Sequence, residues 1–200
     1  MTSGPLTEER IIDAAEDVLR RFGPRKTNVV DVARELGVSH GTVYRHFPSK
    51  AALGDAVVRR WLHRVSEPLE AIVAKPGPKI RRLKNWFQTL MAIKRAKVHD
   101  DPELFAAYAA LADGSREVVH AHVEALVAQV GRILADETAS DATIAARDQR
   151  TARAVFQATL RFHHPIHSAE WSDPAIDSDF DAVWALIEKA LDAPRGSEDV

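Results

Sequence analysis

Apolar residues recur at three- and four-residue steps in nearly every segment outside the turns, which predicts an all-α protein. The first helix is expected from about Thr7 to Phe22, and the dipeptide Gly23-Pro24 ends it. The apolar residues of this helix are Ile11, Ala14, Ala15, Val18, Leu19 and Phe22. Their spacing puts all six on one face.

A short second helix follows from the same spacing at Val29, Val32, Ala33 and Leu36. Asn28 is its expected N-cap, and Asp31 occupies the capping-box position, although Asp stands there in place of Glu. Gly37 is the expected C-terminal stop. Val30 lies off the apolar stripe and should be exposed.

The segment GVSHGTVYRHFPSK, residues 37–50, predicts a third helix held at a fixed angle. Ser39 can cap its first turn, and Val38 before the cap can meet Val43 as a hydrophobic staple. Val43 and Phe47 are four residues apart and should point inward. The outer face would then consist of His40, Gly41, Tyr44 and Arg45.

Pro48-Ser49 ends this helix and starts a fourth one, with Ser49 as N-cap. Two short helices joined by a tight glycine-containing turn are typical of a helix-turn-helix, whose second helix reads DNA. The spacing alone also fits a small helical bundle that binds no DNA.

The run TNVVDVARELGVSHGTVYRHFPSKAAL closely resembles the TetR family of bacterial transcriptional regulators. The resemblance covers about residues 7–60 and includes the first helix, IIDAAEDVLRRFG. It implies binding of DNA phosphates by Tyr44, His46 and Lys50. It also implies an approach to the bases or the DNA backbone by His40, Gly41 and Thr42.

The chemistry of these positions agrees with that role. Lys50 lies in the first turn of the fourth helix, where backbone N–H groups already favour a phosphate. Thr27 and Asn28 are placed in the same way at the second helix. The expected DNA-binding residues are Thr27, Asn28, Ser39, His40, Gly41, Thr42, Tyr44, Arg45, His46 and Lys50.

Beyond residue 60 the chain stays helical, with one further helix expected over about Thr143 to Phe162 and about nine helices in all. We expect a helix-turn-helix domain at 1–50, a larger helical domain at 51–194 and a frayed tail at 195–200, with the fourth helix, from residue 49, linking the two domains. The resemblance implies that the larger domain binds a small molecule and forms a homodimer.

Two residue sets in the larger domain are candidates for these roles. The pocket candidates combine aromatic or apolar character with a few polar groups: Trp86, Phe87, Met91, Phe105, Tyr108, Val123, Val127, Phe162 and His163. Filling of the core is the alternative reading for each of them. The dimer candidates form one stripe of the last helix: Phe180, Val183, Trp184, Ile187 and Leu191.

Charge is unevenly distributed between the two halves of the chain. Residues 1–100 hold 19 Lys and Arg against 11 Asp and Glu, whereas residues 101–200 hold 8 against 18. The first half therefore suits a polyanion. The chain has no cysteine, signal-peptide pattern or long apolar run, so we expect a cytoplasmic protein without disulfides.

Three histidines, His163, His164 and His167, leave a helical metal-binding protein or enzyme as the alternative function. Pro165 breaks the helix that would align them, so we expect no metal and no cofactor apart from a small-molecule effector. Common catalytic motifs are absent from the sequence, and we expect no enzyme activity. The resemblance implies a repressor that leaves a palindromic double-stranded DNA operator when the effector binds.

Overall fold

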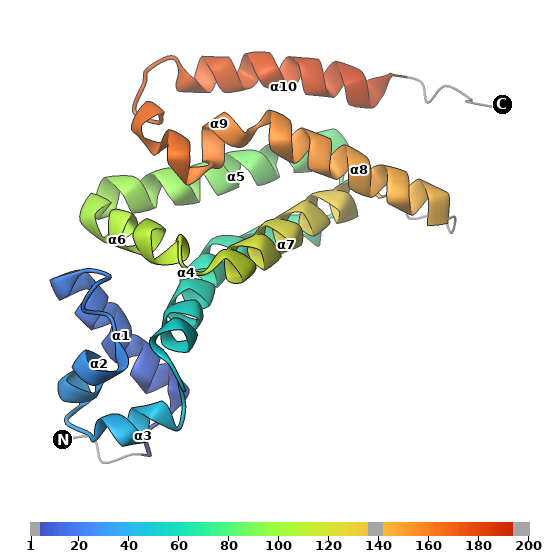
Figure 1. Cartoon of the computed structure of the whole chain (residues 1–200). Helices are drawn as coiled ribbons and strands as arrows, with labels where there is room; N and C mark the ends of the chain where they lie inside the picture. The colour runs from blue at the N-terminus through green and yellow to red at the C-terminus, as the bar shows by residue number, and fades with distance from the viewer. Residues whose placement is uncertain (1–4, 136–141, 194–200) are drawn as a thin grey trace. The chain divides into compact units, whose positions relative to one another are not determined.

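The computed structural model describes residues 5–135 and 142–193, and all regular structure within them is helical (Figure 1). The elements are α1 Glu8–Phe22, α2 Val29–Leu36, α3 His40–Tyr44, α4 Lys50–Val73, α5 Lys79–Asp100, α6 Pro102–Ala112, α7 Arg116–Leu134, α8 Ala142–Ala158, α9 Leu160–His163, the 3-10 helix η1 Pro165–Glu170 and α10 Ile176–Asp192. The predicted all-α fold is confirmed. None of these helices is both long and apolar enough to cross a membrane.

The chain packs as two compact units. Unit 1 combines Met1–Ser66 with Ala96–Glu124, and unit 2 combines Glu67–Arg95 with Ala125–Val200. The long helices α4, α5 and α7 therefore each contribute to both units. The domain limits expected at 1–50 and 51–194 stay predictions, and the expected tail at 195–200 lies outside the described residues.

The core of unit 1 is built on the apolar face of α1. Ile11, Ala15 and Leu19 are almost completely buried, as their spacing predicts. Phe22, the last residue of the same apolar face, is instead 59% exposed. Phe22 ends the helix, and the guanidinium of Arg21 lies over its ring, 5.3 Å from the ring centre. A terminal residue lacks the following turn that would cover it.

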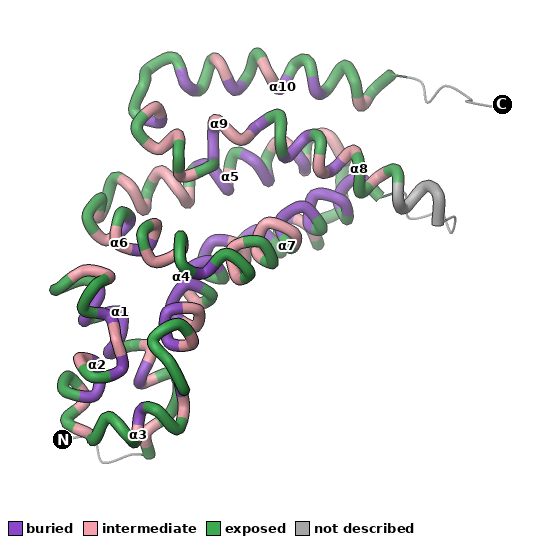
Figure 2. Tube along the Cα trace, in the orientation of Figure 1, coloured by how far each residue is buried: buried purple, intermediate pink, exposed green. Residues whose placement is uncertain are grey.

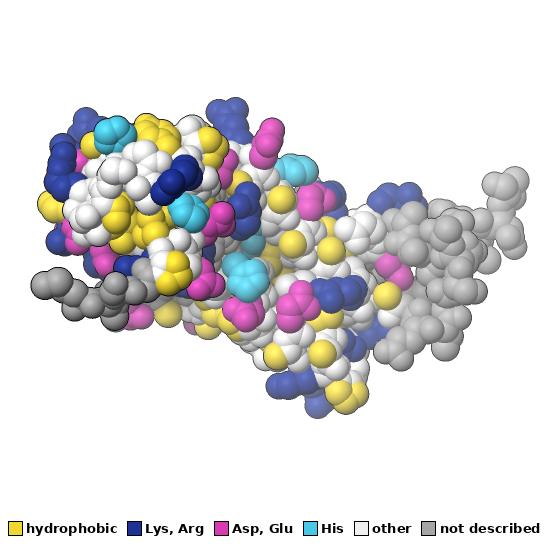
Figure 3. All heavy atoms as spheres, turned by 90° about the horizontal axis from the view of Figure 1, so that it is seen from below, with side chains coloured by type: hydrophobic (Ala, Val, Ile, Leu, Met, Phe, Trp, Pro, Cys, Tyr) yellow, Lys and Arg dark blue, Asp and Glu magenta, His cyan; other side chains and the backbone are white. Residues whose placement is uncertain are grey.

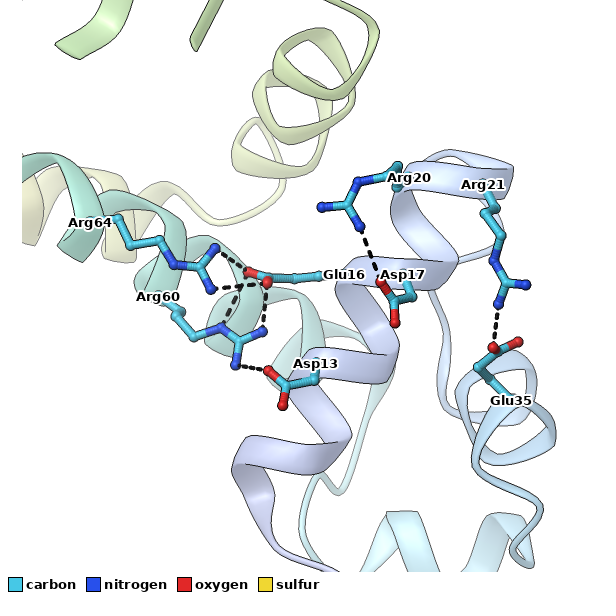
Figure 4. Close-up of polar contacts among 8 residues, drawn as sticks. All are labelled: Asp13, Glu16, Asp17, Arg20, Arg21, Glu35, Arg60 and Arg64. Atoms are coloured by element: carbon cyan, nitrogen blue, oxygen red, sulfur yellow. Dashed lines mark hydrogen bonds and ion pairs between the residues drawn. The ribbon is translucent and has the colours of Figure 1, made fainter. Parts of the chain in front are cut away.

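A buried carboxylate connects α1 to α4 (Figure 4). Glu16 is only 7% exposed and accepts two hydrogen bonds from the Arg64 guanidinium, each 3.1 Å long. Arg60 donates to Glu16 through Nε at 3.2 Å and to Asp13 through Nη1 at 2.6 Å. These contacts balance a charge that burial would otherwise disfavour.

Aromatic side chains fill the core of unit 2. Trp86 and Trp184 both pack on Phe87, with ring centres 4.9 Å and 6.1 Å apart. The Trp86 indole N–H donates to the Gln129 side-chain oxygen at 2.9 Å, and Gln129 donates to Glu70 at 2.8 Å. The buried indole N–H of Trp86 and the side chain of Gln129 are thus satisfied within the unit.

The helix predicted from about Thr143 to Phe162 is interrupted at Thr159. There α8 ends and the short α9 begins. The Thr159 hydroxyl is fully buried, 3.0 Å from the Val155 carbonyl oxygen and 3.1 Å from that of Phe156. A threonine that bonds back to the preceding turn in this way competes with the helical hydrogen bonds and bends the helix.

We expect Glu16→Gln to lower the free energy of unfolding by about 1–3 kcal/mol, because it removes the charge that balances two arginines. Urea denaturation measures this change. Asp17→Asn is the matched control, since Asp17 pairs with Arg20 on the solvent side of α1 and should cost about 0–1 kcal/mol. Equal losses in both variants would contradict a special role for the buried carboxylate.

Candidate DNA-binding site

A left-handed glycine and two serine caps set the end of α2 and the starts of α3 and α4. Gly37 adopts the left-handed conformation, with φ 65° and ψ 29°, and ends α2. Ser39 Oγ accepts the backbone N–H of Thr42 at 3.2 Å, and Ser49 Oγ accepts that of Ala52 at 3.0 Å. The predicted helix starts and stop are therefore confirmed.

Two buried side chains hold α3 against the body of unit 1. Val43 is completely buried and Phe47 is 6% exposed, as predicted. The helix packs on α2 and otherwise shows mostly exposed positions (Figure 2). On the outer side, the His40 and Tyr44 rings meet edge to face, with centres 6.4 Å apart. This pair presents aromatic rings and polar atoms to solvent.

The remaining predicted positions surround this pair. Exposed residues among them are Ser39, Gly41, Arg45 and Lys50, and Thr42 and His46 are half-buried. In the view of Figure 3, Lys, Arg and His side chains lie among hydrophobic and acidic ones. A surface with cationic and aromatic groups on a short helix can bind phosphates and base edges.

Thr27 is a correction to the predicted site. Its side chain is completely buried, and its hydroxyl donates to the Gly23 carbonyl oxygen at 3.2 Å. It therefore presents no group to DNA. Asn28 is half-exposed, but its oxygen caps Val30 and Asp31 and its amide donates to the Asp31 carboxylate at 2.6 Å. This side-chain bond replaces the backbone contact of a regular capping box.

Three exposed residues next to the start of α2 add to the candidate surface. Arg25 and Lys26 precede the helix and were not predicted, although two adjacent cations before a helix N-terminus were visible in the sequence. Val30 is 48% exposed, as predicted. An apolar side chain can touch a thymine methyl group but cannot hydrogen-bond to guanine.

Two family matches agree with this geometry. Residues 11–57 match the family described as bacterial regulatory proteins, tetR family. Residues 80–184, more than half of the chain, match the tetracyclin repressor-like C-terminal domain. The chain belongs to the TetR family. This family consists of transcriptional regulators.

Individual TetR-family relatives are distant. An uncharacterized HTH-type transcriptional regulator of Mycobacterium tuberculosis is 31% identical over 101 residues, 50% of this chain and 48% of the relative, so the match spans about half its length. Thermus thermophilus FadR, a repressor solved with lauroyl-CoA, has a TM-score of 0.56 at 18% identity, covering 97% of this chain and all of FadR. Mycobacterium smegmatis BioQ has a TM-score of 0.52 at 24% identity, and the match covers 93% of this chain and 98% of BioQ. A further BioQ structure contains its double-stranded DNA operator. These structural likenesses support the fold.

The predicted pocket residues of this TetR-family chain pack mostly in the cores of the two units. Phe105 and Tyr108 lie in unit 1 against Trp61, whose ring stacks on Tyr108 at 4.9 Å. Val123 is half-buried in the same unit, and Met91 lines a surface hollow between α5 and α10. Fully or almost fully buried in unit 2 are Trp86, Phe87, Met91, Val127, Phe162 and His163.

The predicted dimer stripe on α10 is largely covered by its own chain, which corrects the sequence interpretation. Phe180 packs edge to face on Phe162 at 5.4 Å, and Trp184 packs on Phe87. Ile187 is 9% exposed. Half-buried positions of the stripe are Val183 and Leu191. The exposed large hydrophobic side chain of this helix is Leu186, at 68%.

Each of the three histidines considered for a metal already has a local contact. His163 Nε2 lies 3.2 Å from the Thr159 hydroxyl, His164 Nδ1 accepts the Ile166 backbone N–H, and His167 Nδ1 lies 2.7 Å from Glu170. Within residues 5–135 and 142–193, no group of three or more His, Asp or Glu side chains is arranged to hold a metal ion.

His163 makes stability depend on pH. Burial, and then the nearby charge of Lys94, lowers the pKa of His163 to about 3. An unfolded histidine takes up a proton near pH 6.5, so between pH 6.5 and about 3 the unfolded state binds more protons. The free energy of unfolding therefore falls as the pH falls through this range, by up to about 1.4 kcal/mol per pH unit.

We expect His163→Gln to remove the contribution of His163 to the pH dependence of stability. The glutamine amide replaces the imidazole as a group that can hydrogen-bond. Urea denaturation at pH 7.0, 6.0 and 5.0 compares the variant with the wild type and with His99→Gln, which replaces an exposed histidine. The wild type and His99→Gln should lose stability more steeply than His163→Gln. Parallel pH profiles in all three proteins would contradict the assignment.

Proposed function

We propose that this chain is a ligand-released transcriptional repressor that binds a palindromic operator as a homodimer. The observation that carries the proposal is the exposed pair His40 and Tyr44, fixed on a short helix by buried Val43 and followed by exposed Lys50. A duplex presents phosphates on both sides of its major groove, so a short helix flanked by cations fits it.

Lys50 is the phosphate contact in this proposal. It begins α4 beside the Ser49 cap, where free backbone N–H groups and the helix dipole add to its charge. Tyr44 and His46 contact phosphates as well. His40 and Arg45 read base edges, because Val30 has no hydrogen-bonding group for them.

Dimerisation doubles this reading surface. Two copies place two recognition helices one helical turn apart on a palindrome. Because the predicted α10 stripe is occupied internally, the outer face of α10 around Leu186 is the proposed contact. The relatives support a DNA and effector role: FadR was solved with lauroyl-CoA and BioQ with its operator.

Release requires a small molecule that binds the free form better than the DNA-bound form. A ligand with equal affinity for both forms would leave the operator occupied. We propose that the effector acts through α4, which carries Lys50 at its first position.

In this proposal the protein works in the cytoplasm, has no enzymatic activity and needs no cofactor besides the effector.

Footprinting on DNA upstream of its own gene, at several salt concentrations, tests operator binding. Lys50→Ala and Tyr44→Phe should weaken binding similarly on all sequences, because phosphate contacts carry no base information. Lys50→Ala should also reduce the slope of log affinity against log salt by about 2 per dimer, about 1 for each copy. Arg116→Ala, at an exposed position in α7, is the control and should bind as the wild type does.

His40→Ala should instead change sequence preference, because this residue faces the bases in the proposal. Selection from a randomised operator library measures the preference of each variant. An unchanged preference would remove His40 from the reading set. Wild-type affinity of Lys50→Ala, or lack of any protected site at low salt, would contradict DNA binding through this surface.

A further inference from the structure

A cationic hollow lies where α4 ends and α5 begins, wholly within unit 2. Its volume is about 390 Å³, within the range of small-molecule sites. Four cationic side chains line it: Lys75, Arg81, Arg82 and Lys84. Ile72 and Pro76 add an apolar part. The residues predicted for the ligand pocket take no part in this lining.

The charge of the hollow is unbalanced. No Asp or Glu lines it, and the sequence from residue 71 to residue 99 contains eight Lys and Arg without one acidic residue. Lys84 pairs with Asp181 of α10 at 2.8 Å, and that carboxylate is 62% exposed. Lys75, Arg81 and Arg82 have no acidic residue beside them in the lining, and like charges around one hollow repel unless an anion lies between them.

Arg82 adds a second, independent observation. Its Nη2 donates to the Val73 carbonyl oxygen at the end of α4, which ties the guanidinium to the hollow's edge. Its Nε is buried, and it has no hydrogen-bond acceptor among the described residues. A buried N–H without an acceptor costs free energy, so the Arg82 side chain gains from a small shift that brings its guanidinium to a ligand oxygen in the hollow that it lines.

We propose that the hollow binds a small molecule carrying two or more linked phosphate groups. Arginine forks match phosphate oxygens in geometry and keep their charge, and a single carboxylate would leave most of the four cations unbalanced. The apolar part formed by Ile72 and Pro76 accommodates the remainder of the ligand. The concave shape favours a small ligand over duplex DNA, whose phosphates lie on a convex surface.

Calorimetric titration of the full chain with sodium tripolyphosphate tests this site without involving operator DNA. We expect saturable binding by the wild type and about tenfold weaker binding by Lys75→Gln/Arg81→Gln, which removes two charge-assisted contacts. Arg59→Gln/Arg116→Gln is the control, because it removes two exposed positive charges elsewhere. It should change affinity less than about twofold.

Three outcomes would overturn the proposal: no saturable binding by the wild type, equal weakening in both double variants, or equally tight binding of monophosphate and tripolyphosphate. An unrelated DNA duplex that displaces tripolyphosphate, and loses affinity in the hollow variant only, would assign the hollow to nucleic acid instead. Thermal melting checks folding. If Lys75→Gln/Arg81→Gln unfolds, Lys75→Gln alone should still bind about threefold more weakly, and wild-type affinity would again overturn the proposal.

Discussion

Val43 is completely buried on the inward face of α3, and the candidate DNA surface depends on that burial. A helix of five residues is not stable alone, because its nucleation fixes several residues for few hydrogen bonds. Packing on α2 and burial of Phe47 supply the missing stability, and the Ser39 cap satisfies the first turn. The outer pair of His40 and Tyr44 has a fixed position only because of this anchoring.

A second constraint links α1 to the helix that begins with Lys50. Glu16 is buried and needs both Arg60 and Arg64 of α4 to balance its charge. A movement of α4 relative to α1 must either carry α1 along or break these bonds, which leaves a buried charge unpaired. The network therefore favours joint movement of α1 and the first part of α4, within unit 1, in the proposed release.

In unit 2, aromatic packing explains why two residue sets chosen from the sequence serve the core. Trp86, Phe87, Phe162 and Trp184 pack near one another, and Lys94 donates to the His163 carbonyl oxygen at 2.9 Å. Burial lowers the pKa of Lys94 to about 8, which reflects how tightly this region closes around its polar groups. The cationic hollow, by contrast, is lined mainly by charged and polar side chains.

The sequence by itself determined the features that depend on neighbouring residues. Helical periods, the caps at Asn28, Ser39 and Ser49, and the stop at Gly37 involve contacts within a few positions, so all were predictable. The family resemblance then predicted the helix-turn-helix.

Only the tertiary structure decided which element covers each face. Burial of Thr27 and the pairing of Glu16 with Arg60 depend on helices brought together by the fold. The α10 stripe has the pattern of an interface, yet its own chain covers it. A hydrophobic period shows that a face must be buried, but the partner is selected by packing across the whole fold.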